Sequence, residues 1–215
     1  MSDDGSLAAS RVAALYQRHA ARWAQARSES GAARPAGARL LEQDWLDRFL
    51  AALPGPRVLD LGCGTGDPLA RWLAGQGCRI TGIDAAPALL ERARAALPGQ
   101  CWIEGDMRTF DLGERFDGLL GWCSLFHLTP ADQRPIFARL RRHAAPGAVL
   151  MFTSGPAEGE AIGSFGGEPL YHGSLSAPEY RAILAAQGFE ILSHVVEDPD
   201  CGGLTVWLAR LAPSA

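Results

Sequence analysis

The sequence predicts an α/β domain built around a mostly parallel β-sheet with helices on both of its faces. From Arg57 onward, short and mostly uninterrupted apolar runs alternate with helical segments, which is the pattern of strands buried on both sides. An acidic, glycine-containing turn joins the last two runs, so we expect them to form a hairpin whose last strand is antiparallel. Seven runs are expected to be strands: Val58–Leu61, Arg79–Ile83, Trp102–Glu104, Gly118–Trp122, Ala148–Thr153, Phe189–Val196 and Leu204–Arg210.

Proline, glycine and capping residues mark the helices between these strands. Pro87 suits the first turn of a helix, and Gly77 suits the position just after one. Ser176-Ala177-Pro178-Glu179 is a capping box that opens a helix ending at Gly188. The helices between the earlier strands are expected near Pro68–Gln76, Pro87–Leu97 and Thr129–His143.

The 215 residues predict one domain with two segments. Residues 1–56 carry two amphipathic helical stripes, which Pro54-Gly55-Pro56 ends, so we expect a helical N-terminal cover. Residues 57–215 are expected to form the core of the same domain. Within it, residues 154–175 contain six glycines and show no periodicity, which predicts a long loop acting as a lid.

Composition excludes several classes of function. The net charge of −4 argues against a nucleic-acid-binding surface, because phosphate neutralisation needs clustered cations. The longest apolar stretch, Leu119–Leu128, is too short to cross a membrane, which needs about 20 residues. Five scattered cysteines and the acidic N-terminus favour reduced thiols in the cytoplasm. No spacing of histidines and acids predicts a metal site, and we expect a monomer or homodimer.

The segment Val58-Leu-Asp-Leu-Gly-Cys-Gly-Thr-Gly66 carries the strongest functional signal. It predicts a buried strand that runs into a glycine turn, where backbone N–H groups can approach a ligand. A dinucleotide fingerprint would place its third glycine at residue 67, which is Asp67. Asp60, just before the turn, suits a ligand with a cationic group better than a pyrophosphate. The alternative is a strand–turn–helix corner whose glycines serve packing alone.

Asp84 ends the second strand, 22 residues after Gly62. That is the distance at which a βαβ unit delivers a carboxylate to a ribose diol, whose hydroxyls would donate to it. The alternative role is the N-cap of the following helix, and the two roles are compatible.

Together these motifs resemble the class I S-adenosylmethionine-dependent methyltransferases. Glu104-Gly105-Asp106-Met107, Phe116–Trp122 and Ala145–Leu150 are similar to the later motifs of that family, and the resemblance covers Arg57 to Arg210. It implies a Rossmann-like three-layer αβα sandwich with a seven-stranded sheet. It also implies S-adenosylmethionine as the cofactor, with methyl transfer to a small-molecule acceptor.

The resemblance assigns cofactor contacts residue by residue. Asp60 would organise the turn and the methionyl amine, Asp84 would hold the ribose, and Asp106 with Met107 would meet the adenine. Tyr16 and Arg27 would cover the methionyl end, although Tyr16 also suits the core and Arg27 an exposed face. The other positions implied at the cofactor are Gly62, Cys63, Gly64, Ala85 and Trp122.

Four further residues are candidates at the acceptor. His127 lies just beyond the fourth strand, where the transferred methyl should lie, and could be a general base or a structural histidine bonded to the backbone. Phe165, Tyr171 and His172 are candidate acceptor contacts in the predicted loop, or surface residues of it. Two other functions stay open: an NAD-dependent oxidoreductase, and a protein that binds S-adenosylmethionine without turnover.

Overall fold

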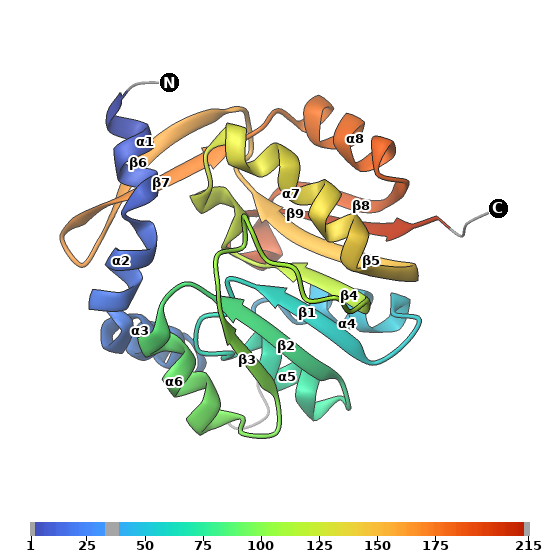
Figure 1. Cartoon of the computed structure of the whole chain (residues 1–215), viewed down its shortest axis with the longest axis horizontal. Helices are drawn as coiled ribbons and strands as arrows, with labels where there is room; N and C mark the ends of the chain where they lie inside the picture. The colour runs from blue at the N-terminus through green and yellow to red at the C-terminus, as the bar shows by residue number, and fades with distance from the viewer. Residues whose placement is uncertain (1–2, 33–38, 213–215) are drawn as a thin grey trace.

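A seven-stranded sheet forms the centre of the protein in the computed structural model, which describes residues 3–32 and 39–212 (Figure 1). The strand order is β3-β2-β1-β4-β5-β9-β8. Neighbours from β3 to β5 pair in parallel, whereas β9 is antiparallel to both β5 and β8. The predicted seven-stranded sheet with an antiparallel last strand is confirmed. Its strands are β1 (Arg57–Leu61), β2 (Arg79–Asp84), β3 (Cys101–Glu104), β4 (Phe116–Gly121), β5 (Ala144–Ser154), β8 (Phe189–Asp198) and β9 (Leu204–Leu211).

Helices cover both faces of the sheet, which gives the expected three layers (Figure 1). On one face, buried side chains of α4 (Gln43–Ala52), α5 (Leu69–Gly75) and α6 (Pro87–Ala96) pack in one apolar cluster. On the other face, α7 (Pro130–His143) and α8 (Ala177–Ala186) pack in a second cluster. Because every sheet face is covered by apolar helix surface, the strands read as continuous apolar runs in the sequence.

Local signals fix the helix ends where the sequence predicts them. The Ser176 hydroxyl accepts a hydrogen bond from the Glu179 N–H at 3.3 Å, as a capping box requires. Gly188 follows α8 with φ +79°, a left-handed conformation that glycine adopts without strain. The Thr129 hydroxyl caps α7 by accepting from Asp132 N at 3.2 Å, and Pro135 lies inside that helix.

The N-terminal residues form the helices α1 (Asp3–Ser10), α2 (Val12–Arg18) and α3 (Ala20–Ala32), as the apolar stripes predict. They run along one side of the molecule, from the hairpin of β6 (Gly159–Phe165) and β7 (Glu168–Ser174) past α6 (Figure 1). Residues 1–2, 33–38 and 213–215 of the two predicted segments lie outside the described residues. Across the described ranges, each helix is too short or too polar to span a membrane. All five cysteines are free thiols.

The expectation of a loop at residues 154–175 is wrong. This segment contains an antiparallel hairpin of β6 (Gly159–Phe165) and β7 (Glu168–Ser174), separate from the main sheet. Residues 159–164 of β6 are exposed, so no apolar alternation reveals the strand. The two-residue turn Gly166-Gly167, with φ of +65° and +85°, is the local signal that predicts a tight hairpin.

Candidate active site

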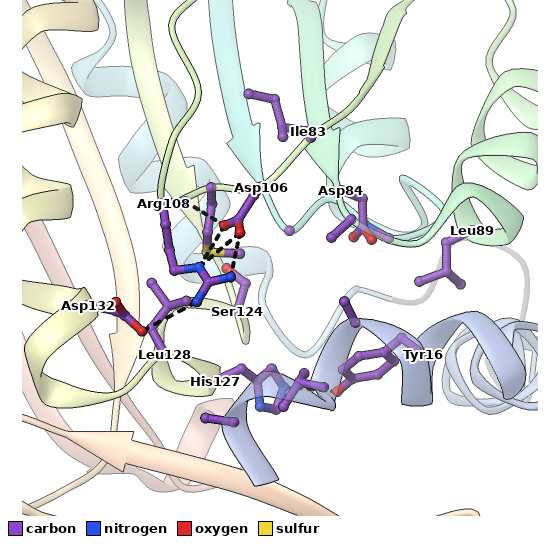
Figure 2. Close-up of a pocket in the computed structure, with 18 of the residues that line it drawn as sticks. Tyr16, Ile83, Asp84, Leu89, Asp106, Arg108, Ser124, His127, Leu128 and Asp132 are labelled. Carbon is purple, nitrogen blue, oxygen red and sulfur yellow. Dashed lines mark hydrogen bonds and ion pairs between the residues drawn. The ribbon is translucent and has the colours of Figure 1, made fainter. Parts of the chain in front are cut away.

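A cleft lies between the carboxyl ends of the parallel strands and the N-terminal helices (Figure 2). Ligands of open α/β sheets bind at this edge. A smaller hollow continues beyond it on the other side of the glycine turn. Gly62, Gly64, Trp23 and Cys123 line both spaces, so the two form one continuous site.

Twelve of the predicted site residues line this site. The cleft is lined by Tyr16, Gly62, Gly64, Asp84, Ala85, Asp106, Met107 and His127. The hollow adds Arg27, Asp60, Cys63 and Trp122. The three hairpin residues Phe165, Tyr171 and His172 are not among the described lining residues.

The glycine turn after β1 needs glycine at its first position. Gly62 has φ +70°, and a Cβ there would lie 2.4 Å from Ser124 Cβ. The Ser124 hydroxyl in turn donates to the Leu61 carbonyl at 2.6 Å, which holds the segment after β4 against the turn. Because no side chain fits between Gly62 and Ser124, the main chain of the turn separates the cleft from the hollow.

Asp84 connects the ends of β1 and β2. Its two carboxylate oxygens accept from Gly64 N at 2.8 Å and from Ala86 N at 2.9 Å. Burial raises its pKa, while these backbone hydrogen bonds lower it. Asp84 is not the cap of the next helix, because the N-cap of α6 is Ala86 and has no side-chain cap bond. Each oxygen keeps a second lone pair for a donor in the cleft.

Asp106 and Met107 follow β3 and line the cleft. Asp106 lies on the same side as Asp84, across from Tyr16 and His127 (Figure 2). Arg108 holds the Asp106 carboxylate, with its Nη2 2.6 Å from Oδ2, and also reaches Asp132 at 3.6 Å. Burial alone would raise the pKa of Asp106, but the Arg108 hydrogen bonds bring it below its usual value. Asp106 is therefore a fixed acceptor that stays ionised.

The hollow combines one buried acid with two donors. Asp60 is 5% exposed, and burial together with the charge of Asp84 raises its pKa to about 7, while Arg27 lowers it. Arg27 is held by Glu42, with 3.3 Å between Nη2 and Oε1. The indole N–H of Trp122 is buried and has no acceptor among the described residues. A buried donor without a partner costs about 1–3 kcal/mol, and Trp122 is one of the residues that line the hollow.

Two hydrogen bonds link Tyr16, His127 and the main chain of Tyr171 at the cleft. His127 Nδ1 lies 2.9 Å from the Tyr171 carbonyl oxygen, which can only accept, so Nδ1 carries the hydrogen. Its Nε2 therefore accepts from the Tyr16 hydroxyl at 2.9 Å. Burial lowers the pKa of His127 to about 4, and burial also raises the pKa of Tyr16 well above its usual value. Both side chains are uncharged at neutral pH. His127 makes the backbone hydrogen bond expected of a structural histidine, and it also lines the cleft, as expected of a residue that contacts the acceptor.

The hairpin reaches the cleft through contacts with its walls. The Phe165 ring packs 5.7 Å from Trp23 and 6.0 Å from Tyr16, and Glu168 pairs with Arg18 at 2.5 Å. The His172 ring lies 5.1 Å from that of His127. Tyr171 has no exposed surface, so its side chain is a buried residue and not a surface one. Its part in the site is its main-chain carbonyl.

The comparisons with known proteins agree on one family. A family model described as "Methyltransferase domain" matches residues 58–147. An uncharacterized methyltransferase of Synechocystis is 35% identical over 47% of this chain and 48% of its own length. Trans-aconitate 2-methyltransferase of Escherichia coli is 38% identical over 43% and 36%. The chain thus spans less than half the length of these two relatives.

A solved structure extends the match to nearly the whole fold. The S-adenosylmethionine-bound structure of CalS10, an amino pentose methyltransferase from Micromonospora echinaspora, is 26% identical, with a TM-score of 0.65 over 86% of this chain and 97% of that one. Residues 58–147 therefore match a methyltransferase domain, and the whole fold is similar to that of a solved methyltransferase. S-adenosylmethionine is the cofactor bound in that solved structure.

Three residues of this site, or of its immediate support, are not predicted from the sequence. Trp23 lies against the glycine turn, where a Cβ on Gly64 would be 3.3 Å from its Nε1. Arg108 clamps Asp106, and the buried Glu42 holds Arg27. The apolar stripe containing Trp23 gave the nearest signal, whereas nothing local marks Glu42 or Arg108 as partners.

Proposed function

We propose that this protein transfers the methyl group of S-adenosylmethionine to a small-molecule acceptor. The observation that carries the proposal is the pairing of an acid with two donors in the hollow beside the glycine turn. Asp60 suits an ammonium group, while Arg27 and the unpartnered Trp122 N–H suit a carboxylate. These are the two charged groups of an amino acid, and the cleft beyond them is large enough for a nucleoside portion.

The remaining cofactor residues fit the nucleoside end. Asp84 would accept from the ribose hydroxyls through the lone pairs that its two backbone bonds leave free. Asp106 would accept from the adenine amino group, with Met107 and Ala85 against the ring. Gly62, Cys63 and Gly64 would let the backbone lie against the ligand, and Tyr16 would cover it from α2.

The bound cofactor supplies an activated methyl on a sulfonium, so the protein has to position the acceptor and exclude water. His127 faces the cleft through Nε2 and would contact the reacting group of the acceptor. The oxidoreductase alternative loses support at residue 67, because Asp67 stands where a dinucleotide turn needs glycine and pairs with Arg71 at 3.4 Å.

A turnover assay separates an enzyme from a protein that only binds the cofactor. The purified protein is incubated with S-adenosylmethionine and a panel of metabolites, and S-adenosylhomocysteine is measured. We expect its formation to depend on one class of acceptor. Tight cofactor binding with no turnover on any acceptor would support the sensor or assembly role instead.

Cofactor affinity should rise with pH up to about 7 because of Asp60. An ammonium group favours the ionised carboxylate, so binding should release the proton that the free protein holds below its pKa of about 7. Calorimetry between about pH 5.5 and 8 should show affinity falling up to roughly tenfold per unit on the acid side. Asp60→Asn should remove this dependence and weaken binding. If cofactor affinity in the unmodified protein did not change with pH, Asp60 would not be the group that binds the methionyl amine.

We propose that the hairpin acts as the lid over the acceptor, with Phe165 and His172 as its contacts. His172→Ala should lower turnover by about tenfold while cofactor affinity changes by less than about 0.5 kcal/mol, because His172 touches His127 and not the cofactor residues. Ile162→Ala, at an exposed position of the same hairpin, is the matched control and should change neither value. Loss of cofactor affinity in His172→Ala would place the hairpin over the donor instead.

We expect activity to persist in the presence of a chelator. Residues 3–32 and 39–212 contain no group of three histidine, cysteine or acidic side chains arranged for a metal. Activity that returned only on adding magnesium would overturn this expectation.

The five free thiols fit a protein of the cytoplasm. The net charge of −4 fits a protein without a nucleic-acid partner. We propose that the protein acts as a monomer or a homodimer.

A further inference from the structure

The relatives' names point to different acceptors, so the class of acceptor has to come from this chain's own cleft. Its described lining carries three carboxylates, Asp84, Asp106 and Asp132, and one cation, Arg108. Arg108 is engaged by Asp106 at 2.6 Å and by Asp132 at 3.6 Å. Asp84 and Asp106 are assigned to the ribose and the adenine of the cofactor, so Asp132 is the described carboxylate left toward an acceptor. No unpaired cation among the described lining residues faces an incoming acceptor.

The lack of an unpaired cation selects against anionic acceptors. A carboxylate or phosphate would enter a partly buried space that holds Asp132 and no free counter-ion among the described residues, where like charges repel. A thiolate meets the same obstacle. A neutral or positively charged acceptor does not, and the small apolar side chains of Ala9, Val12 and Ala13 leave room for an uncharged body.

Among the described residues, no strong base lies beside the acceptor. Burial lowers the pKa of His172, the hairpin imidazole proposed to contact the acceptor. His127 accepts through Nε2 but is a weak base in its buried site, with a pKa of about 4. Tyr16 keeps its proton, because burial raises its pKa. Asp84 is committed to two backbone amides on the donor side. An aliphatic hydroxyl must lose its proton as it attacks, and none of these groups is suited to take it.

A nucleophile that is uncharged and needs no deprotonation as it attacks satisfies both conditions. We propose, on the basis of the proposed methyl transfer, that the acceptor is an amine, and that His127 positions it by accepting its N–H at Nε2. The acceptor N–H takes the place of the Tyr16 hydroxyl there, while the Tyr171 carbonyl keeps Nδ1 as the donor and Nε2 as the acceptor.

The step balances without a base from the protein. An amine that arrives as an ammonium ion first loses that proton to water. The lone pair of the neutral amine then forms the bond to the methyl carbon, and the carbon–sulfur bond breaks with its electron pair staying on sulfur. Sulfur becomes a neutral thioether, and the positive charge passes to the methylated ammonium. The carboxylates of the cleft stabilise that ammonium, which loses its proton to water after release.

Labelled methyl transfer tests the class of acceptor. The protein is given 13C-methyl-labelled S-adenosylmethionine and a library in which each carbon skeleton occurs as an amine, an alcohol and a carboxylic acid. Carbon chemical shifts then distinguish N-methyl, methyl ether and methyl ester products. We expect label only in N-methyl groups. Methyl ester or ether products would overturn the amine while leaving methyl transfer in place, and no product despite cofactor binding would overturn both.

Two His127 variants test its positioning role with the accepted amine. His127→Gln keeps an acceptor oxygen and should lower kcat by less than about tenfold, whereas His127→Leu should lower it further. Cofactor affinity, measured by calorimetry, should stay the same in both and serves as the control for folding. An equal loss of about 10²- to 10⁴-fold in both variants would show that His127 acts as a general base.

Discussion

Asp84→Ala should weaken S-adenosylmethionine binding by roughly 1.5–3 kcal/mol, or about 10- to 150-fold in Kd, the usual effect of removing a charged hydrogen-bond partner. The substitution removes the acceptor for the ribose hydroxyls. It also frees the Gly64 and Ala86 amides, which the carboxylate holds at 2.8 and 2.9 Å. Isothermal titration calorimetry measures the change directly.

Two further variants separate these contributions. Asp84→Asn keeps one oxygen acceptor and should have an intermediate affinity. Glu91→Ala removes an exposed acid from the neighbouring α6 and should leave affinity unchanged. If Asp84→Ala bound the cofactor as tightly as the unmodified protein, the role of Asp84 would be limited to joining the ends of β1 and β2.

Gly62→Ala should destabilise the fold by roughly 2–5 kcal/mol and abolish measurable cofactor binding. The left-handed φ of +70° costs an alanine about 1–2 kcal/mol. The new Cβ would meet Ser124 Cβ at 2.4 Å, and relieving such a contact costs about 1–3 kcal/mol more. Urea denaturation gives the free energy of unfolding.

Gly77→Ala is the matched control for this variant. Gly77 also has a positive φ, +89°, but a Cβ there would meet nothing within 4 Å. The free energy of unfolding of the Gly77→Ala variant should fall by only about 1–2 kcal/mol, and the variant should keep its cofactor affinity. Equal stability losses in the two variants would show that the contact between Gly62 and Ser124 relaxes without cost.

The sheet was predictable because its signals are local. The strands β1 to β5 are short, mostly apolar runs of the kind that a two-sided sheet requires. The Ser176 capping box and Gly188 bracket α8 as expected. The β6–β7 hairpin was not predicted, because exposed β6 has no alternation to reveal it. The Gly166-Gly167 turn is the local signal of this hairpin, and it lies outside any periodic pattern.

The candidate site was predictable as far as strand ends define it. Asp60, Gly62 and Asp84 come from one βαβ unit, so their spacing in the sequence places them together. The Tyr16–His127 bond joins residues 111 positions apart, and the Glu42–Arg27 pair also involves an N-terminal helix. Both contacts depend on how those helices pack, which periodicity does not specify. Arg108 lies two residues from Asp106, but no motif in the sequence marks it as the partner of that carboxylate.

Calorimetry with S-adenosylmethionine and NAD as competing candidates tests the central claim, that the cleft and the hollow hold a methyl donor. We predict that S-adenosylmethionine and S-adenosylhomocysteine bind with one site per chain, that Asp84→Ala weakens both, and that NAD gives no binding heat. Tight binding of NAD together with no binding of S-adenosylmethionine would contradict the account.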